Sequence, residues 1–438
     1  MPVYRESGGT ILYDVVKVQT CSGQPLEVTT SSGDIAYIQA GGTSSDAFGR
    51  FRVSEPLTLF DSSHRFSTNG NWNTDTAVSG TATFNADQGL IDLDVVTTSG
   101  SKVYRETNKV FSYQPGKSLL FMATFVMADD QENLRQRVGY FGTSNGIYFE
   151  QSGSTYSIVK RSSVSGSTVN TAVTQTNWNG DKLNGSGESG FNLDPTKAQI
   201  FWADFEWLGV GTVRTGFVIN GQFIVAHSFH HANTIDSTYI TTATLPVRYE
   251  IEALDTLASG ATLKEICTTV ISEGGYQIRG QSRSAGTLIT AAKTFTSSGV
   301  AYPVVSLRLK TSPNRLDAVV IPNAIAFIGQ GNNALFNWEV VAGGTTSGGT
   351  WATTDSGSSV EYNISGTSFS GGTVLAQGYV SANTQGQNAL AVTAADLFKY
   401  QLQRNSFTST STEITFVVKS KVDGDTGFGS IDWEEITT

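Results

Sequence analysis

The sequence predicts an all-β protein, with an N-terminal β arm followed by two β-sandwich domains of the jelly-roll or lectin-like kind. The chain of 438 residues holds 46 Gly but only 15% charged residues, so good helix formers for exposed faces are scarce. Its 24 Phe, 15 Tyr and 7 Trp supply enough apolar surface to build cores. Short apolar alternations separated by Gly- and Ser-rich stretches recur along most of the chain, as expected of many strands joined by turns.

Four segments follow from the distribution of these patterns. Residues 1–45 contain short apolar runs between Gly- and Ser-rich loops, too few for a core of their own, and are predicted to form an arm or small β-domain. Residues 46–66 are denser in aromatic and charged side chains. A β-sandwich is predicted over 67–258 and a C-terminal β-domain over 259–438, with the boundary at Ala258-Ser259-Gly260.

Period-two alternation identifies the strands of the first sandwich. In the runs 89–96, 201–209 and 245–254, apolar residues on one face oppose polar or charged residues on the other, as in strands with one face in a core. The apolar run from Leu119 to Met127 suits a strand buried on both faces. Asn220-Gly221 lies between two apolar runs and predicts a hairpin with a type I′ turn, and Asn145-Gly146 is a weaker case.

The C-terminal part repeats this style, with strand candidates at 262–275, 304–311, 316–322, 337–344, 372–380 and 412–420. One helix is predicted, over Ala394–Arg404, because Thr393 is a suitable cap and Asp396 lies in the first turn. No repeat of 20–50 residues is evident, which argues against a solenoid.

Charge and cysteine content exclude several classes of function. The net charge of −10 and pI of about 5.0, without basic clusters, argue against binding nucleic acid or anionic membranes. No apolar run reaches the roughly 18 residues that a membrane span needs, and the start, MPVYRESGGT, lacks the features of a secretion signal. Cys21 and Cys267 are far apart, so they predict no zinc site and leave a disulfide undecided.

Two clusters of polar side chains are candidate chemical sites. His227, His230 and His231 are interpreted as a surface cluster at a hairpin end rather than as a metal site, because no carboxylate lies beside them. Glu206 could face Glu250 or Glu252 across a sugar bond, about 5–10 Å apart, if their strands were neighbours. The favoured interpretation is a solvated sheet face with Arg214 and Arg248 as partners. Phosphate-binding loops and nucleophile motifs are absent, so no cofactor or metal is expected.

The segment DAFGRFRVSEPLTLFDSSHRF, residues 46–66, is predicted to be a docking or assembly element, and an ordinary interdomain staple is the equal alternative. Its Phe residues can insert between sheets while its Arg residues pair with carboxylates. The residues predicted to carry this role are Asp46, Phe48, Arg50, Arg52, Phe60 and Asp61.

This segment resembles one found in structural proteins of tailed-bacteriophage virions, in which D-A-F-G-R-x-R leads into S-x-P-x-x-L-F-D. Two further segments, 205–229 with 245–251 and 266–276 with 301–310, are similar to the same group. The resemblance implies a β-rich virion component, assembled in the host cytoplasm, and it brings no catalytic residues. By analogy it implies a homo-oligomer, with a trimer favoured, that contacts other proteins of the capsid or tail.

We therefore expect a non-enzymatic fibre or decoration protein, attached to head or tail by its N-terminal region. One alternative is an adhesin that binds host surface glycans, with Trp202, Glu206 and Glu250 as candidate binding residues and Trp351 as a further aromatic platform. Another is a depolymerase of envelope glycans that uses Glu206 with Glu250 or Glu252.

Overall fold

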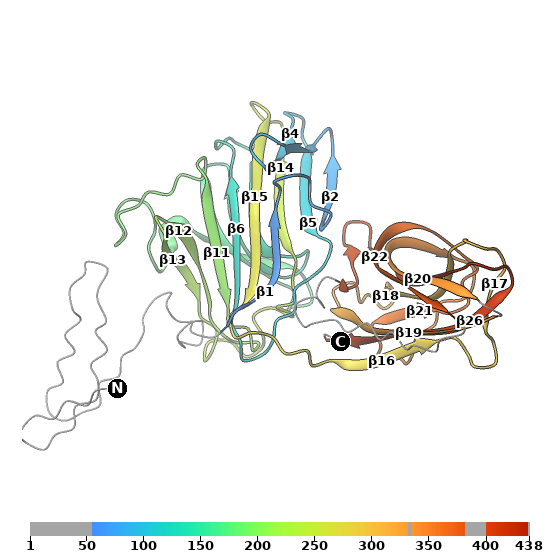
Figure 1. Ribbon diagram of the computed structural model, residues 1–438. Helices are drawn as coiled ribbons and strands as arrows, with labels where there is room; N and C mark the ends of the chain where they lie inside the picture. Colours follow the sequence, from blue (N-terminus) through green and yellow to red (C-terminus); the bar gives the residue numbers. More distant parts are fainter. Residues whose placement is uncertain (1–54, 332–333, 382–399, 437–438) are drawn as a thin grey trace, which may run out of the picture. The chain divides into compact units, whose positions relative to one another are not determined.

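The computed structural model describes residues 55–331, 334–381 and 400–436 (Figure 1). The chain divides into two compact units, Met1–Gly41 and Gly42–Thr438, and all described residues belong to the second. The predicted arm and four docking residues, Asp46, Phe48, Arg50 and Arg52, lie outside the described part. Within that part the elements are strands, apart from a short 3₁₀ helix, η2 (Gln175–Asn177), so the predicted all-β class is confirmed.

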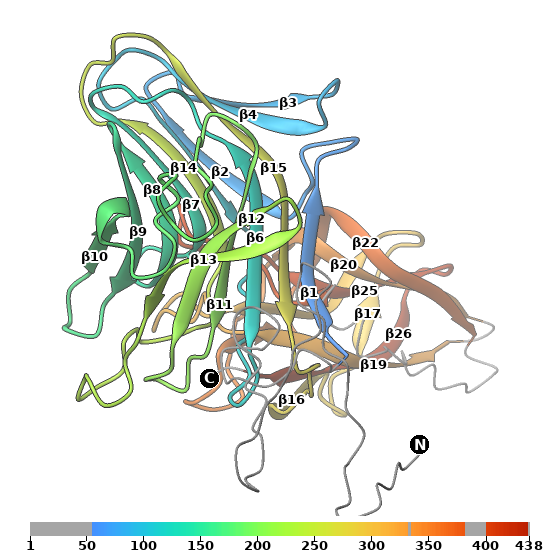
Figure 2. The ribbon, with the colours of Figure 1, turned by 90° about the vertical axis from the view of Figure 1, so that its left-hand side faces the viewer.

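The first sandwich consists of two antiparallel sheets, which Figures 1 and 2 show as packed layers. The eight-stranded sheet runs in the order β13 (Gln222–Phe229), β12 (Val213–Ile219), β11 (Gln199–Phe205), β6 (Leu119–Val126), β15 (Ala261–Ser272), β4 (Leu90–Val95) and β3 (Thr81–Asn85), and β1 (Leu57–Ser63) also pairs with β15. The seven-stranded sheet runs β10 (Val169–Thr174), β9 (Thr155–Ser162), β8 (Gly146–Ser152), β7 (Leu134–Phe141), β14 (Val247–Ala253), β5 (Lys102–Thr107) and β2 (Trp72–Ala77).

Alternating side chains build the core between these sheets. Phe201 of β11 packs 5.5 Å from Phe217 of β12 and 6.0 Å from Phe149 of β8, measured between ring centroids, so aromatic rings join the two layers. The predicted alternation is confirmed for β4. In β11 and β14 the side chains also alternate between the faces, but the predicted solvated face is wrong because Asp204 and Glu250 are buried. The prediction for β6 is only partly correct, because Met122, Thr124 and Val126 on one face are partly exposed.

The predicted Asn-Gly turns both join strands. Asn220 (φ 52°) and Gly221 (φ 76°) link β12 to β13 with positive φ at both positions, as a type I′ turn requires. Asn145-Gly146 lies at the end of a four-residue turn between β7 and β8, in which the Gly142 amide donates to the Asn145 carbonyl at 2.8 Å. Gly146 has φ 138°, so this turn is of another type.

The predicted boundary at Ala258-Ser259-Gly260 is wrong. These residues form the connection from β14 to β15, and β15 lies inside the eight-stranded sheet, paired with β6, β4 and β1. The described end of the docking segment is also part of this sandwich, because Leu57–Ser63 is β1. A Ser/Gly turn between two sheets has the same composition as an interdomain linker, which explains the error.

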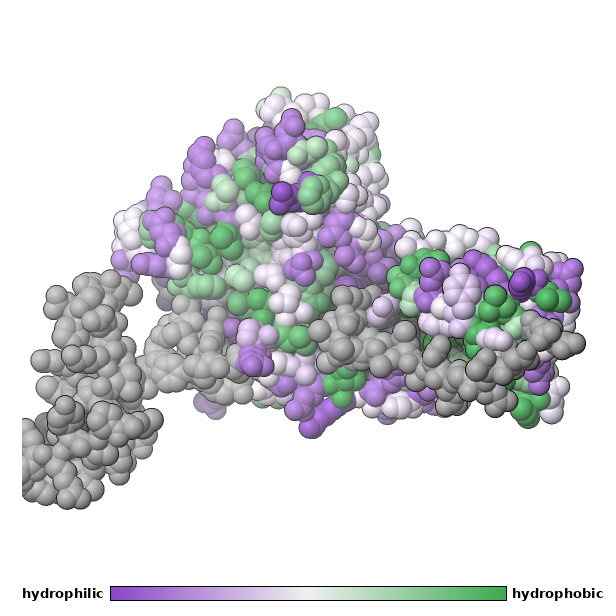
Figure 3. Space-filling model, viewed as in Figure 1, coloured by the Kyte–Doolittle hydropathy of each residue, from purple (hydrophilic) through white to green (hydrophobic). Residues whose placement is uncertain are grey.

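The second sandwich follows β15 and has its own core, centred on Phe336, Phe416 and Trp433. A four-stranded sheet joins β16 (Gln281–Gly286), β26 (Asp425–Glu435), β17 (Lys293–Phe295) and β19 (Val320–Gln330). A five-stranded sheet has the order β21 (Val360–Asn363), β18 (Tyr302–Leu309), β25 (Ile414–Ser420), β20 (Leu335–Ser347) and β22 (Ser368–Ser381). On the face in Figure 3, hydrophobic and hydrophilic patches are interspersed over this sandwich.

The predicted helix over Ala394–Arg404 is wrong at its C-terminal end, and residues 394–399 lie outside the described part. Gln401–Gln403 have no helical hydrogen bonding, and Arg404–Asn405 is β23, which pairs with β24 (Thr410–Ser411). The backbone of this segment bonds to other elements instead, since the amide of Leu402 donates to Val320 and that of Arg404 donates to Asn108. We find no helix among the described residues with the length and apolar character needed to cross a membrane.

Candidate functional site

The outer face of the seven-stranded sheet gathers a group of charged side chains. In β14, Val247, Tyr249 and Ile251 point into the core, so Arg248, Glu250 and Glu252 point outward. The strand register places Glu250 opposite Arg137 of β7 and Arg248 opposite Glu106 of β5. Opposite charges therefore lie side by side across three neighbouring strands.

These side chains form a continuous series of ion pairs, here called the ion-pair chain. It runs from β7 through β14 and β5 and consists of Arg137, Glu250, Arg248, Glu106 and Arg404. Its successive N–O distances are 2.5, 2.5, 3.1 and 2.7 Å, and all five side chains are buried. A buried charge is tolerated only when it is paired, so each member depends on its neighbours.

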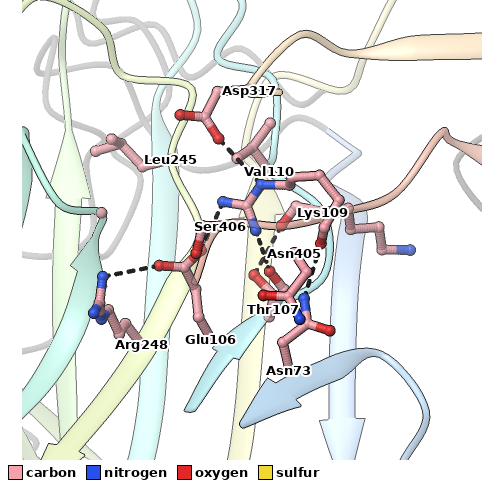
Figure 4. A network of polar contacts seen from close by, with 12 residues as sticks. Asn73, Glu106, Thr107, Lys109, Val110, Leu245, Arg248, Asp317, Asn405 and Ser406 are labelled. Carbon is pink, nitrogen blue, oxygen red and sulfur yellow. Dashed lines mark hydrogen bonds and ion pairs between the residues drawn. The ribbon is translucent and has the colours of Figure 1, made fainter. Parts of the chain in front are cut away.

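The last member, Arg404, belongs to a segment from the C-terminal part of the chain, Gln401–Phe407, here called the strap. Arg404 Nη1 donates to the Thr107 carbonyl at 2.7 Å, and Arg404 Nε donates to Asp317 Oδ1 at 3.1 Å (Figure 4). Asn73 Nδ2 donates to the Arg404 carbonyl at 2.8 Å. Arg404 thus bonds through side chain and backbone to the edge of the first sandwich.

Further strap residues extend this contact along the same face. Ser406 Oγ donates to Glu106 Oε1 at 2.7 Å, so Glu106 has two arginines and one hydroxyl around it and is only 1% exposed (Figure 4). The Arg248 guanidinium lies 5.1 Å from the centroid of the Phe407 ring. The strap therefore covers part of the polar face and connects it to the C-terminal part of the chain.

Two pKa shifts reflect this environment. Burial favours the neutral form of Arg137, but the Glu250 carboxylate together with Tyr148, Tyr104 and Glu150 outweighs burial and holds the pKa of Arg137 above its usual value. Burial and the nearby Glu250 carboxylate raise the pKa of Tyr104 to about 12, and its hydroxyl donates to Glu252 Oε2 at 2.7 Å. Both side chains keep their ordinary charge state at neutral pH and act as hydrogen-bond donors.

The three predicted glycan-binding residues are not brought together. Trp202 is 0% exposed and packs edge-on against Phe223, so its ring offers no face to a sugar. Glu206 follows β11 of the eight-stranded sheet, where its carboxylate accepts from the Thr212 amide at 3.1 Å. Glu250 lies on β14 of the other sheet and is occupied by two arginines. The carboxylate pair that the depolymerase alternative needs is therefore not formed by Glu206 with Glu250 or Glu252.

The histidine cluster is divided between several local contacts. His231 stacks on Tyr239 with 4.0 Å between ring centroids, its Nδ1–H donates to the Gly211 carbonyl at 2.6 Å, and its Nε2 lies 3.0 Å from Lys160 Nζ. His227 accepts from the Asn179 amide at 3.3 Å. Burial lowers the pKa of both histidines to about 4. Within the described ranges, no group of three or more His, Cys, Asp or Glu side chains could hold a metal ion.

Two docking residues, Phe60 and Asp61, are described and lie on β1. The Phe60 ring is buried and packs against Phe111 and Trp72, with centroid distances of 4.8 and 6.0 Å. Asp61 is exposed. Lys109 lies 5.8 Å from the Phe60 ring, and burial lowers its pKa to about 8 although Asp61 opposes this shift. Phe60 therefore belongs to the core, and Asp61 is the accessible one of the two.

Sequence reasoning missed two features that position these elements. One is the strap. The other is a buried cluster in which Glu265 of β15 accepts from His64 at 2.8 Å and from Arg105 of β5 at 2.6 Å, which ties the two sheets together. The only signal in the sequence was a lone Glu on the apolar side of a strand pattern, since its partners lie far away along the chain.

An open groove with a volume of about 1060 Å³ lies beside β9 and β10 on the first sandwich. The loop after β13 forms its other wall. Its lining combines apolar side chains with hydroxyl, amide and charged ones, the latter including Lys160, Ser162, Thr171, Asn233, Thr234 and Asp236. Such groups can hydrogen-bond to the hydroxyl groups of a sugar.

No protein-family model matches the sequence, and a search of curated proteins found no match. Among solved structures, the chain is similar to the carbohydrate recognition domain of Emp47p (10% identity, 49% of this chain and 97% of that one, TM-score 0.31). It is also similar to a β-1,3-glucanase from Mycobacterium marinum (8%, 49% and 98%, TM-score 0.35) and to the CBM2 module of the evolved Dit of Lactobacillus casei BL23 phage J-1 (6%, 50% and 96%, TM-score 0.30). At such low scores, these neighbours carry no assignment of function.

Proposed function

We propose that this chain is a non-catalytic structural subunit of a tailed-phage virion, a homo-oligomeric fibre or decoration protein attached to head or tail by its N-terminal region. A trimer is the favoured state. The resemblance of residues 46–66 to virion structural proteins supports this proposal, and so does an all-β chain with few charges and many Gly and Ser residues.

The observation that carries the proposal is that the charged side chains on the outer face of the seven-stranded sheet pair with one another. The arginines and carboxylates that could bind a substrate are already ion-paired with one another in the ion-pair chain, and the strap covers part of them. Buried, mutually paired charges hold one geometry at a cost in desolvation, which suits a rigid scaffold better than a site that opens to substrate. A subunit that connects other proteins of a particle needs its two sandwiches to be held rigidly.

The proposal is tested by incorporation into particles. Phage particles are assembled with either the full-length chain or a chain lacking residues 1–45, purified on a density gradient, and probed with an antibody against residues 55–436. We expect the full-length chain in the particle band and the truncated chain, folded and soluble, outside it. If the full-length chain is missing from the particles, the virion role is wrong. If the truncated chain is incorporated fully, attachment through the arm is wrong.

A second candidate function is binding of host surface glycans in the open groove beside β9 and β10. The observation that favours it is the density of hydrogen-bonding side chains around an unobstructed volume of about 1060 Å³. A glycan array probed with the purified chain tests it, with Asp236→Ala as the variant and Asp94→Ala, on a distant strand, as the control. Binding lost in the first variant alone would support this role, and an array without hits would reject it.

A further inference from the structure

The outer edge of β22 is a long strand edge that no other described strand covers. β22 spans 14 residues and ends the five-stranded sheet, where only β20 pairs with it. From Ser368 to Val380, no strand in the described part of the chain lies along its other side. Over the extended run from Thr373 to Val380, at about 3.3 Å per residue, this edge offers roughly 26 Å of backbone donors and acceptors.

This edge lacks most of the devices that keep strand edges from pairing with other chains. Its sequence, SFSGGTVLAQGYVS, has no charged residue and no Pro, whereas exposed edges are commonly protected by Lys or Pro. Two irregularities occur, a bulge between Val374 and Ala376 and positive φ at Gly371 (74°) and Gly372 (86°). Val374 and Tyr379 are 46% and 65% exposed, and Leu335 on β20 adds a further exposed apolar side chain near Tyr379.

Other edges of the described sheets differ from β22. β21, at the opposite edge of the same sheet, has only four residues, and its Glu361 is ion-paired with Arg308. β2 carries Asp75, which is paired with Lys102. β10 is uncharged but has only six residues. β13 and β19 are also edge strands without Asp, Glu, Lys or Arg, but the amides of Gly180 and Asp181 donate to carbonyls of β13, and β19 contains Pro322. β22 is longer than either strand and contains no Pro.

We propose that β22 pairs edge to edge with a second copy of this chain. The chain has a net charge of −10, so two copies repel each other wherever their acidic surfaces meet. β22 adds no charge to this repulsion, which makes it the edge along which identical chains can approach and form backbone hydrogen bonds. A basic partner would instead be recognised through acidic side chains, and β22 has none.

This contact deepens the proposed function, because it gives the homo-oligomer its interface. It remains testable on purified protein without any particle. A wild-type chain that is monomeric yet joins particles would overturn the edge contact and leave the virion role standing. An oligomer that depends on β22 but never enters particles would overturn the virion role and support the edge contact.

The test measures the mass of the full-length chain by light scattering over a dilution series, for the wild type and for Val374→Lys/Tyr379→Lys. Lysines brought together along one edge repel each other, and we expect dissociation on the order of 100-fold easier than in the wild type. The control is Val169→Lys/Thr171→Lys on β10, where Val169 is 51% exposed. Its mass should remain that of the wild type.

A second variant guards against loss of folding. Thr373→Asp/Gln377→Asp places charges of the opposite sign at two exposed polar positions of β22, and its strand content is checked by circular dichroism. Folded monomers in both β22 variants, with an oligomeric control, support the contact. A monomeric wild type at every concentration overturns it, as do β22 variants that keep the wild-type mass or a control that dissociates equally.

Discussion

Both sandwiches bury charged groups, including Glu435, paired with Arg283, in the second, but their outer surfaces differ. The first sandwich buries charges: five members of the ion-pair chain lie on its outer face, and Glu265 lies between its sheets with two partners. The second sandwich exposes a long uncharged strand, β22, at the side of its larger sheet. The difference indicates a division of roles, in which the first region fixes the geometry of the subunit and the second is available for contact with other chains.

The largest expected effect comes from breaking the ion-pair chain at the strap. Arg404→Ala leaves the Glu106 carboxylate buried with Arg248 and Ser406 only, and removing one partner of a buried pair typically costs about 3–5 kcal/mol. We expect a loss of this order in the free energy of unfolding measured in urea.

The matched control uses the exposed end of the same network. Asp317, which is 63% exposed, also accepts from Arg404, but exposed pairs contribute only about 0–1 kcal/mol. Asp317→Asn should therefore leave the urea midpoint nearly unchanged. Equal losses of unfolding free energy in Arg404→Ala and Asp317→Asn would contradict the claim that the buried pair with Glu106 provides the stabilisation.

The next effect concerns Glu265 and acid stability. Burial alone would raise the pKa of this carboxyl, but Arg105 and His64 outweigh burial and hold the pKa below its usual value of 4.5. The depressed pKa in the folded state means that this stabilisation is complete above pH 4.5 and is lost as the pH falls through the folded-state pKa. The melting temperature of the wild type should fall as the pH drops below 4.5. Glu265→Gln should have a lower melting temperature at pH 7, and its melting temperature should change less on acidification.

A smaller effect is expected at the histidines of the first sandwich. Burial lowers the pKa of His231 from 6.5 to about 4, with Lys160 acting in the same direction, so the unfolded chain binds more protons between these values. Stability should fall as the pH falls from 6.5 to about 4. In His231→Phe, which keeps a ring against Tyr239, melting temperatures across this range should change less; an unchanged pH dependence would show that His231 contributes nothing to it.

The smallest effect is at the β12–β13 hairpin. Gly221 has φ 76° and no atoms within 4 Å of an added Cβ, so Gly221→Ala meets backbone strain without a clash. We expect a loss of about 1 kcal/mol in the free energy of unfolding. Gly70→Ala, with equal space and no positive φ, should be close to neutral, and a similar loss there would remove the turn explanation.

The strands were predictable where one face lies in a core. β4 and β14 showed alternating apolar and polar residues because Leu93 or Tyr249 points inward while Asp92 or Glu250 points outward. The type I′ turn was predictable because Asn220-Gly221 tolerates positive φ. These signals are local, so a single sequence contains them.

The errors came from contacts between distant residues. A Ser/Gly turn at Ala258–Gly260 has the composition of a linker, and only the pairing of β15 with β6 shows that the sandwich continues. The helical pattern that ended at Arg404 was overridden by bonds to Glu106, Thr107 and Asp317, none of which is near in sequence. The similar strand patterns around Glu206 and Glu250 suggested that their strands were neighbours, but the two strands belong to different sheets.

Hydrogen–deuterium exchange at two protein concentrations tests the contrast between the sandwiches most directly. The amides of β5 and β14 should be protected equally at both concentrations, because contacts within one chain cover them. The amides of β22 that point away from β20 should exchange rapidly in dilute solution and become protected in concentrated solution, as this edge pairs with a second copy. Exchange of β22 that is independent of concentration, or exchange of β5 as rapid as that of β22, would contradict the account.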